Sequence, residues 1–227
     1  QFLYFIGVAS DRPAMAGPAP TNPPNVLRDL HLAVCYGDVD TARRLCTREN
    51  ADFVDAEHGL CLLAWAIAGD HLEVAALLLD RGASTKLRDR AGFCPLHRAV
   101  WEGSVGAVKL LLGAGADVNA RSVRHAKTPL ILAALKGSTE KVEALLAHGA
   151  AIDARGTDGM GAIDHATYKG FAPVVERLID AGADCHAARY YCEEGVKHVE
   201  TVPQRENFDR IIELMCRPWV KQSLASV

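Results

Sequence analysis

Residues 89–120 read DRAGFCPLHRAVWEGSVGAVKLLLGAGADVNA, and the rest of the chain repeats the spacing of this stretch. Moving the sequence by 33 residues places Gly82 on Gly115, and moving it by 34 residues places Gly149 on Gly115. A further 33 residues bring Gly182 onto Gly149. A register shared by several copies indicates an internal repeat, which builds an elongated array rather than one globular core.

Each copy contains a short motif followed by two apolar segments of helical spacing. The motif is Cys94-Pro95-Leu96-His97 in the best copy and begins Thr128-Pro129-Leu130 in the next one. Together with the glycines, this pattern resembles the ankyrin repeat, in which about 33 residues form a β-turn and two antiparallel helices. The resemblance implies an all-α fold, an ankyrin-repeat α-solenoid of paired antiparallel helices with β-turn fingers.

The resemblance divides the chain into a tail, an array and a cap. Residues 1–25 are expected to form a Pro/Ala-rich extended N-terminal tail, because five prolines lie within residues 12–25. Residues 188–227 are expected to form an irregular loop and a C-terminal capping helix, since a repeat buries its hydrophobic face only against its neighbours. Five repeats are expected between them, at 26–55, 56–88, 89–121, 122–154 and 155–187.

The first residues have two interpretations. Met15 begins a segment that looks like a natural start, so residues 1–14 are vector-derived in one of them. In the other, the apolar stretch 2–9 docks on this protein or on a neighbour. The stretch is too short to cross a bilayer, which takes about twenty residues, and it lacks the basic region of a signal peptide. No membrane insertion is expected.

Composition narrows the setting of the protein. The net charge of −3 over 227 residues does not favour nucleic acid as a partner. Seven cysteines without close pairing indicate reduced thiols and an intracellular location, in the cytoplasm or nucleus, with the mitochondrial matrix or another organelle interior also open. Cys185, His186, Cys192 and His198 match no zinc spacing, so neither a metal site nor a cofactor is expected.

The resemblance implies that the finger tips and the exposed end of each first helix form the binding surface. Trp101, Leu135 and Tyr168 share one repeat position and would form an apolar ladder, with Glu102, Lys136 and Lys169 beside it. Ser122 also falls on this surface. The candidate partner-binding residues are Arg88, Arg90, Phe93, Trp101, Glu102, Arg124, His125, Lys127, Leu135, Lys136, Arg155, Met160, Tyr168 and Lys169.

A basic, aromatic strip on a net-acidic chain favours a partner segment that is acidic and carries apolar anchors. Trp, Tyr and Arg are the residue types enriched in interface hot spots. In the alternative interpretation, the aromatic residues pack on their neighbours and the arginines are a solvated face. Separately, Asn119 resembles the asparagine that a hydroxylase modifies in some ankyrin proteins, which makes it a candidate modification site.

The sequence therefore predicts a non-catalytic protein-binding scaffold, because nothing in it assembles a nucleophile, a base and an orienting group. Two other functions stay open. One is a permanently assembled accessory subunit of a large multiprotein complex, anchored by the N-terminal tail and the C-terminal cap. The other is the recognition fragment of a larger enzyme or ubiquitin-ligase adaptor.

Overall fold

The computed structural model describes residues 26–185, 188, 191 and 205–215. Residues 205–215 form one helix, and the first range contains ten more, in five successive pairs. The pairs are α1 (Val26–Tyr36) with α2 (Val39–Leu45), α3 (Leu62–Ala68) with α4 (Leu72–Asp80), α5 (Pro95–Trp101) with α6 (Val105–Gly113), α7 (Pro129–Lys136) with α8 (Thr139–Ala147), and α9 (Ala162–Tyr168) with α10 (Ala172–Asp180).

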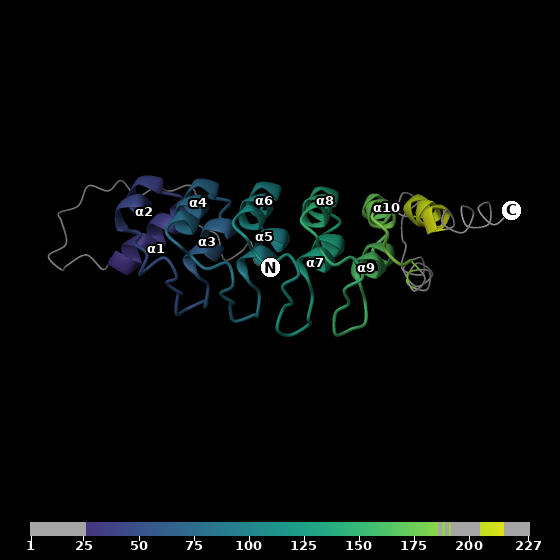
Figure 1. The fold of residues 1–227 in the computed structure, drawn as a ribbon, viewed down its shortest axis with the longest axis horizontal. Helices are drawn as coiled ribbons and strands as arrows, with labels where there is room; N and C mark the ends of the chain where they lie inside the picture. The colour runs from purple at the N-terminus through teal and green to yellow at the C-terminus, as the bar shows by residue number, and fades with distance from the viewer. Residues whose placement is uncertain (1–25, 186–187, 189–190, 192–204, 216–227) are drawn as a thin grey trace.

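The helix pairs stack into a solenoid. The first helices, α1, α3, α5, α7 and α9, form one row and the second helices form another (Figure 1). The loops between successive pairs project as fingers from the side of the first-helix row (Figure 1). Each of the five expected repeat ranges contains one helix pair. The predicted fold class, an all-α solenoid of paired helices, is confirmed.

Local signals start the helices where the sequence motif lies. Pro95 and Pro129 occupy the first turn of α5 and α7, where a missing N–H costs no hydrogen bond. Thr128 caps α7, because its Oγ1 accepts a bond of 3.4 Å from the backbone N–H of Ile131. His97 accepts from the Cys94 N–H at Nδ1 and donates from Nε2 to the Lys127 carbonyl, at 3.3 and 3.0 Å. This histidine therefore ties one repeat to the finger of the next.

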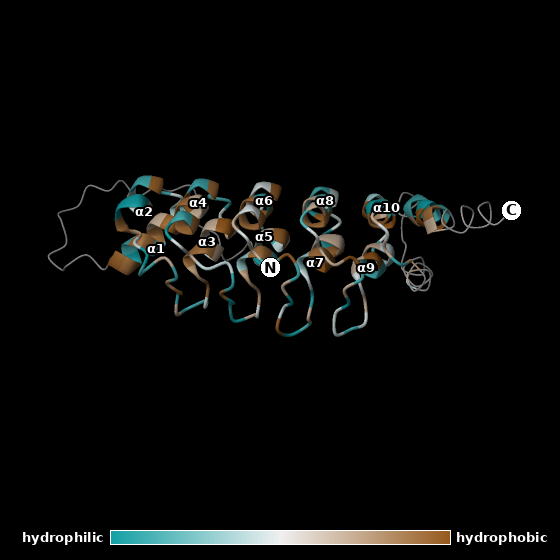
Figure 2. Ribbon diagram, in the orientation of Figure 1, coloured by the Kyte–Doolittle hydropathy of each residue, from teal (hydrophilic) through white to brown (hydrophobic). Residues whose placement is uncertain are grey.

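The core runs continuously between the two rows. Its largest fully buried side chains come from every repeat and include Leu30, Leu63, Leu78, Leu96, Leu111, Leu130, Leu145 and Leu178. Figure 2 shows hydrophobic residues concentrated in the helices, whereas the fingers are mostly hydrophilic or intermediate. Each repeat thus buries its apolar face against its neighbours, and the stack is held together by contacts between adjacent units.

Left-handed backbone recurs between the helices of a pair. Gly37, Gly137 and Gly170 have φ of 71°, 71° and 73° at equivalent repeat positions. Asp70 occupies this same position in the second repeat with φ of 56°. Ala126 also has positive φ, 48°, in the finger of the fourth repeat, which is one residue longer than its neighbours. A side chain in this region is strained by about 1 kcal/mol or more.

Side chains from one repeat cover the helix ends of the one before it. Lys141 of α8 points its Nζ at the carbonyls of Ala99, Val100 and Gly103, at 3.3, 2.8 and 2.7 Å. These carbonyls lie at the C-terminal end of α5, where backbone acceptors lack helical partners and a cation is favoured. Lys141 therefore caps a helix that belongs to the preceding unit.

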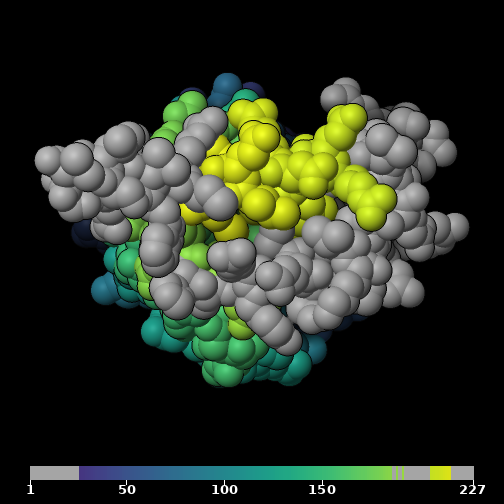
Figure 3. All heavy atoms as spheres, turned by 90° about the vertical axis from the view of Figure 1, so that its right-hand side faces the viewer, coloured from purple at the N-terminus to yellow at the C-terminus, as the bar shows by residue number. Residues whose placement is uncertain are grey.

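The helix 205–215 closes the described stack. Phe208 packs on the fifth repeat so closely that a Cβ on Gly170 would lie 3.0 Å from its ring. Phe171 covers Gly137 in the same way one repeat earlier, at 2.9 Å. Arg210 pairs with Glu176 of α10 at 2.7 Å. Viewed from this end, the helix lies over the fifth repeat (Figure 3). The expected tail, and most of the expected irregular loop, lie outside the described residues.

Candidate protein-binding surface

Three finger arginines are engaged within the protein. Arg88, Arg121 and Arg155 occupy one repeat position. Arg88 Nη1 donates to the Arg121 carbonyl at 2.8 Å, and Arg121 Nη2 donates to the Arg155 carbonyl at 2.6 Å. Arg90 likewise donates to the carbonyl of Ala56 in the preceding finger. These bonds fix the spacing of the fingers and leave the remaining guanidinium donors for a partner, since each guanidinium carries five.

The tip of the fourth finger carries two exposed basic side chains. Arg124 and His125 are exposed, and the His125 carbonyl accepts a bond of 3.0 Å from the Thr157 N–H of the next finger. Ser122 differs from expectation, because it is only 3% exposed and its Oγ accepts from the Lys127 N–H at 3.0 Å. The extra residue of this finger accounts for the burial, since the loop folds back on Ser122.

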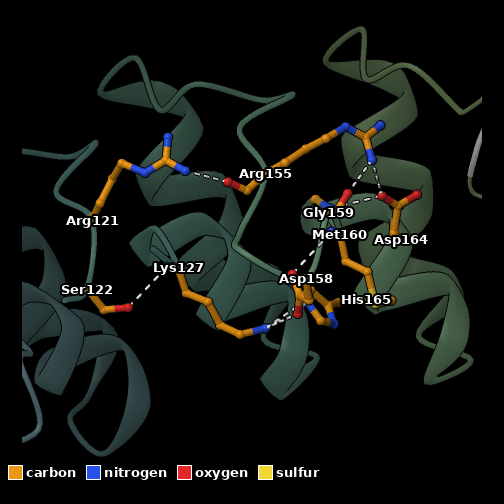
Figure 4. A network of polar contacts seen from close by, with 10 residues as sticks. Arg121, Ser122, Lys127, Arg155, Asp158, Gly159, Met160, Asp164 and His165 are labelled. Atoms are coloured by element: carbon orange, nitrogen blue, oxygen red, sulfur yellow. Dashed lines mark hydrogen bonds and ion pairs between the residues drawn. The ribbon is translucent and has the colours of Figure 1, made fainter. Parts of the chain in front are cut away.

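Lys127 lies at the centre of a charged cluster between the fourth and fifth repeats. Its Nζ is 3.0 Å from Asp158 Oδ2 and 2.9 Å from His165 Nε2 (Figure 4). Burial, and after it the neighbouring positive charge of Lys127, lowers the pKa of His165 to about 4. His165 is therefore neutral at physiological pH and accepts the Lys127 proton at Nε2. Lys127 is half-buried, so it contributes positive charge to the finger side without standing free in solvent.

A second ion pair lies inside the fifth finger. Arg155 Nη1 donates to Asp164 Oδ2 at 2.8 Å and to the Gly159 carbonyl at 2.8 Å (Figure 4). Asp164 is fully buried and also accepts from the Gly161 N–H at 2.9 Å, so it holds the start of α9 where the third repeat uses His97. Met160, in the same finger, is half-buried.

The ends of the first helices present two exposed aromatic side chains, each beside a lysine. Trp101 is 40% exposed, and Lys136 Nζ lies 4.0 Å from its ring centroid. Tyr168 is 37% exposed, and Lys169 Nζ lies 5.9 Å from its ring. Leu135 stands between them but is half-buried and packs on the core. The apolar ladder is therefore two ring–lysine pairs joined by a partly covered leucine.

Glu102 and Phe93 are held by Arg98. Arg98 pairs with Glu102 Oε1 at 2.9 Å and with Asp89 Oδ2 at 2.6 Å. Its guanidinium also lies 5.9 Å from the ring of Phe93, which is half-buried and packs beside His97. The negative charge of Glu102 is thus compensated locally, and the face near Lys136 stays positive.

Asn119 connects the third repeat to the fourth. Its Oδ1 accepts from the Ala151 N–H at 2.7 Å, and its Nδ2 lies 3.4 Å from the Gly149 carbonyl. The residue is exposed. These bonds give Asn119 a structural role, and its modification stays a prediction.

Two residues of this face escape the sequence reasoning. Tyr36 and Leu32 lie one turn apart on α1 and are 64% and 41% exposed. Tyr36 precedes Glu102 by 66 residues and so occupies the same repeat position as Lys136 and Lys169. The same register shift that located the other repeats could have found them. The irregular first finger hid the signal, because it offers no motif on which to align the helix end.

The described residues contain no group of His, Cys, Asp and Glu side chains arranged to hold a metal ion. Of the four residues weighed for zinc, Cys185 is described, and the other three lie outside the described ranges. None of the helices in the described ranges is both long and apolar enough to cross a membrane.

The family model for ankyrin repeats (3 copies) matches residues 30–122 and 123–189. The chain belongs to the ankyrin repeat family, whose repeats generally mediate binding between proteins.

The chain is 34% identical over 167 residues to human ankyrin repeat and SOCS box protein 16, covering 70% of this chain and 37% of that protein. It is 34% identical over 168 residues to the mouse B-cell lymphoma 3 protein homolog, covering 69% and 37%. It is 28% identical over 106 residues to the probable 26S proteasome regulatory subunit p28 of Saccharomyces cerevisiae, covering 46% of each. The chain thus spans well under half the length of these relatives.

Proposed function

We propose that this chain is a non-catalytic intracellular scaffold that binds a segment of a partner protein along its finger tips and first-helix ends. The observation that carries the proposal is the pair of exposed aromatic rings, Trp101 and Tyr168, each beside a lysine on one face. Rings of this size are seldom left exposed on a folded domain without a binding role. They also provide anchors of the kind that dominate interface energies.

The charge on this face favours an acidic segment. Lys136 and Lys169 are exposed, whereas Glu102 is neutralised by Arg98. The finger side adds Arg124 and His125. Carboxylates placed beside these cations would gain both attraction and faster association, and apolar side chains would cover the rings.

Crosslinking mass spectrometry on the protein purified from native extract tests the proposal. The variant Trp101→Ala/Tyr168→Ala removes both rings, and Ile212→Ala is the control, because Ile212 is exposed on the helix 205–215, away from this face. We expect partner crosslinks at Lys136 and Lys169 that disappear in the double variant and persist in the control. Crosslinks that survive loss of both rings would refute the proposed site.

A permanently assembled subunit of a large complex is the second candidate function. Ile212 is 48% exposed on the closing helix, so the end of the stack offers an apolar contact of its own. One relative is named as a probable proteasome regulatory subunit. In this case Ile212→Ala, rather than the double variant, would release the partner. The recognition part of a longer protein is a third reading, consistent with the share of the relatives' length that the chain spans.

A further inference from the structure

The first-helix ends change in size and charge along the stack. At the repeat position of Trp101, the second repeat has Ala68, and at the position of Lys136 it has Gly69. The first repeat instead carries the exposed ring of Tyr36, and the third carries the exposed ring of Trp101. The second repeat therefore offers only a methyl group and backbone on this face, with a large aromatic side chain on each side.

Charge divides the same face into two halves. Asp70 is exposed directly after Gly69, and Asp38 is exposed next to the first repeat's Gly37. The lysines Lys136 and Lys169 lie in the fourth and fifth repeats. A carboxylate on a partner is therefore attracted toward the C-terminal half of the face and repelled from the second repeat.

We propose that this face binds an extended segment of bipartite chemistry, with one large apolar side chain at the second repeat and two acidic side chains at the fourth and fifth. The apolar anchor lies over Ala68 and Gly69, between the rings of Tyr36 and Trp101. The acidic side chains face Lys136 and Lys169. The proposal rests on the proposed function and specifies the partner that this function requires.

The spacing of the repeats determines the spacing of the partner residues. Adjacent helices pack about 8–10 Å apart, and an extended chain advances about 3.3 Å per residue, so one repeat corresponds to about three partner residues. The anchor and the first acidic residue are two repeats apart, and the second acidic residue is one repeat further. The segment therefore carries its acidic residues about six and nine positions from the anchor. A helical segment, at about 1.5 Å per residue, would need roughly twice those separations.

A series of labelled peptides tests this spacing by fluorescence anisotropy on the full chain. Each 24-residue probe carries one Phe and two Glu, the two Glu three positions apart, in a Ser/Gly/Asn background. The separation between Phe and the nearer Glu is three, six, nine or twelve, in both chain directions. We expect the six-residue separation to bind about tenfold more tightly than three or twelve. Equal binding at all separations, or an optimum at twelve, would overturn the proposal.

Two matched pairs of variants locate the anchor and the acidic residues. Ala68→Trp fills the second repeat, and it should fold, because Trp101 occupies the equivalent position of α5. Its control is Ala147→Trp on α8, where the alanine is exposed in the other row. Lys136→Glu reverses the charge, and its control is Lys109→Glu, exposed on α6. We expect about tenfold weaker binding of the six-residue probe by each test variant and no change in either control.

The outcomes separate this inference from the proposed function. If the native partner is still lost in Trp101→Ala/Tyr168→Ala but is held unchanged by Ala68→Trp, the bipartite arrangement is wrong and the proposed function stands. If neither variant affects the partner, both are wrong. If the protein self-associates in sedimentation velocity and Tyr36→Ser abolishes this, a second copy covers the face, and the inference is overturned.

Discussion

Mild acid should destabilise this protein before its carboxylates are protonated, because His165 is buried beside Lys127. The pKa of His165 is lowered to about 4 in the folded protein, from an ordinary value of 6.5. As the pH falls below 6.5, the unfolded chain takes up a proton that the folded protein refuses, so stability is full above that pH and is lost progressively toward pH 4. At pH 5 the solution lies 1.5 units below the ordinary value, and each unit is worth about 1.4 kcal/mol. The expected loss from His165 is therefore about 2 kcal/mol between pH 8 and pH 5.

Urea denaturation of wild type and His165→Leu at both pH values measures this loss. Leucine suits the site, because Leu132 occupies the same position in the fourth repeat and is buried. The other charged groups facing His165 are Asp158, which favours protonation, and Lys169, which opposes it. The pKa of His97 is also lowered by burial, so only the difference between the two proteins isolates His165. If His165→Leu loses as much stability as wild type, the assigned proton balance of the cluster is wrong.

Three further changes have defined effects on the free energy of unfolding, measured by urea titration. Leu111→Ala empties a fully buried site and should cost about 2–5 kcal/mol; a smaller loss would mean that the core collapses around the cavity. Asp70→Gly should stabilise the protein by about 0.5–1 kcal/mol, because glycine relieves a φ of 56°, and a destabilised variant would show that the Asp70 side chain compensates its strain. Lys141→Met leaves the α5 carbonyls of Ala99, Val100 and Gly103 without their cation and should cost about 1–3 kcal/mol, whereas the exposed control Lys109→Met should change stability by less than about 0.5 kcal/mol.

The repeat architecture could be predicted from sequence because its signals are local and recur. Gly115 and Gly149 adopt positive φ, 79° and 81°, after their second helices, and few residues other than glycine do so readily. Pro95 and Pro129 mark helix starts for an equally local reason. Such constraints depend on the backbone of a few residues, so they survive when the rest of the sequence varies.

The candidate site was harder to predict, because it depends on contacts between repeats. Nothing in the sequence distinguishes Arg121, which donates to the next finger, from Arg124, which is exposed. The aromatic position was correctly placed on the surface, but the lysine lying over Trp101 comes from a different repeat. Asp164 replaces a histidine and forms a buried ion pair with Arg155, an outcome that a family motif does not anticipate.

The arginine bonds between fingers make the third repeat self-complementary from head to tail. The unit offers the carbonyl of Arg121 to the arginine behind it and extends the Arg121 guanidinium to the unit ahead. A duplicated copy would satisfy both ends, so the array could lengthen in evolution by whole units, as an open-ended polymer does. Within the described residues this growth is terminated at Arg155, whose Nη1 turns back to Gly159 and Asp164 of its own unit. Replacing Asp164 with histidine would then be the first step in adding a sixth monomer to the chain.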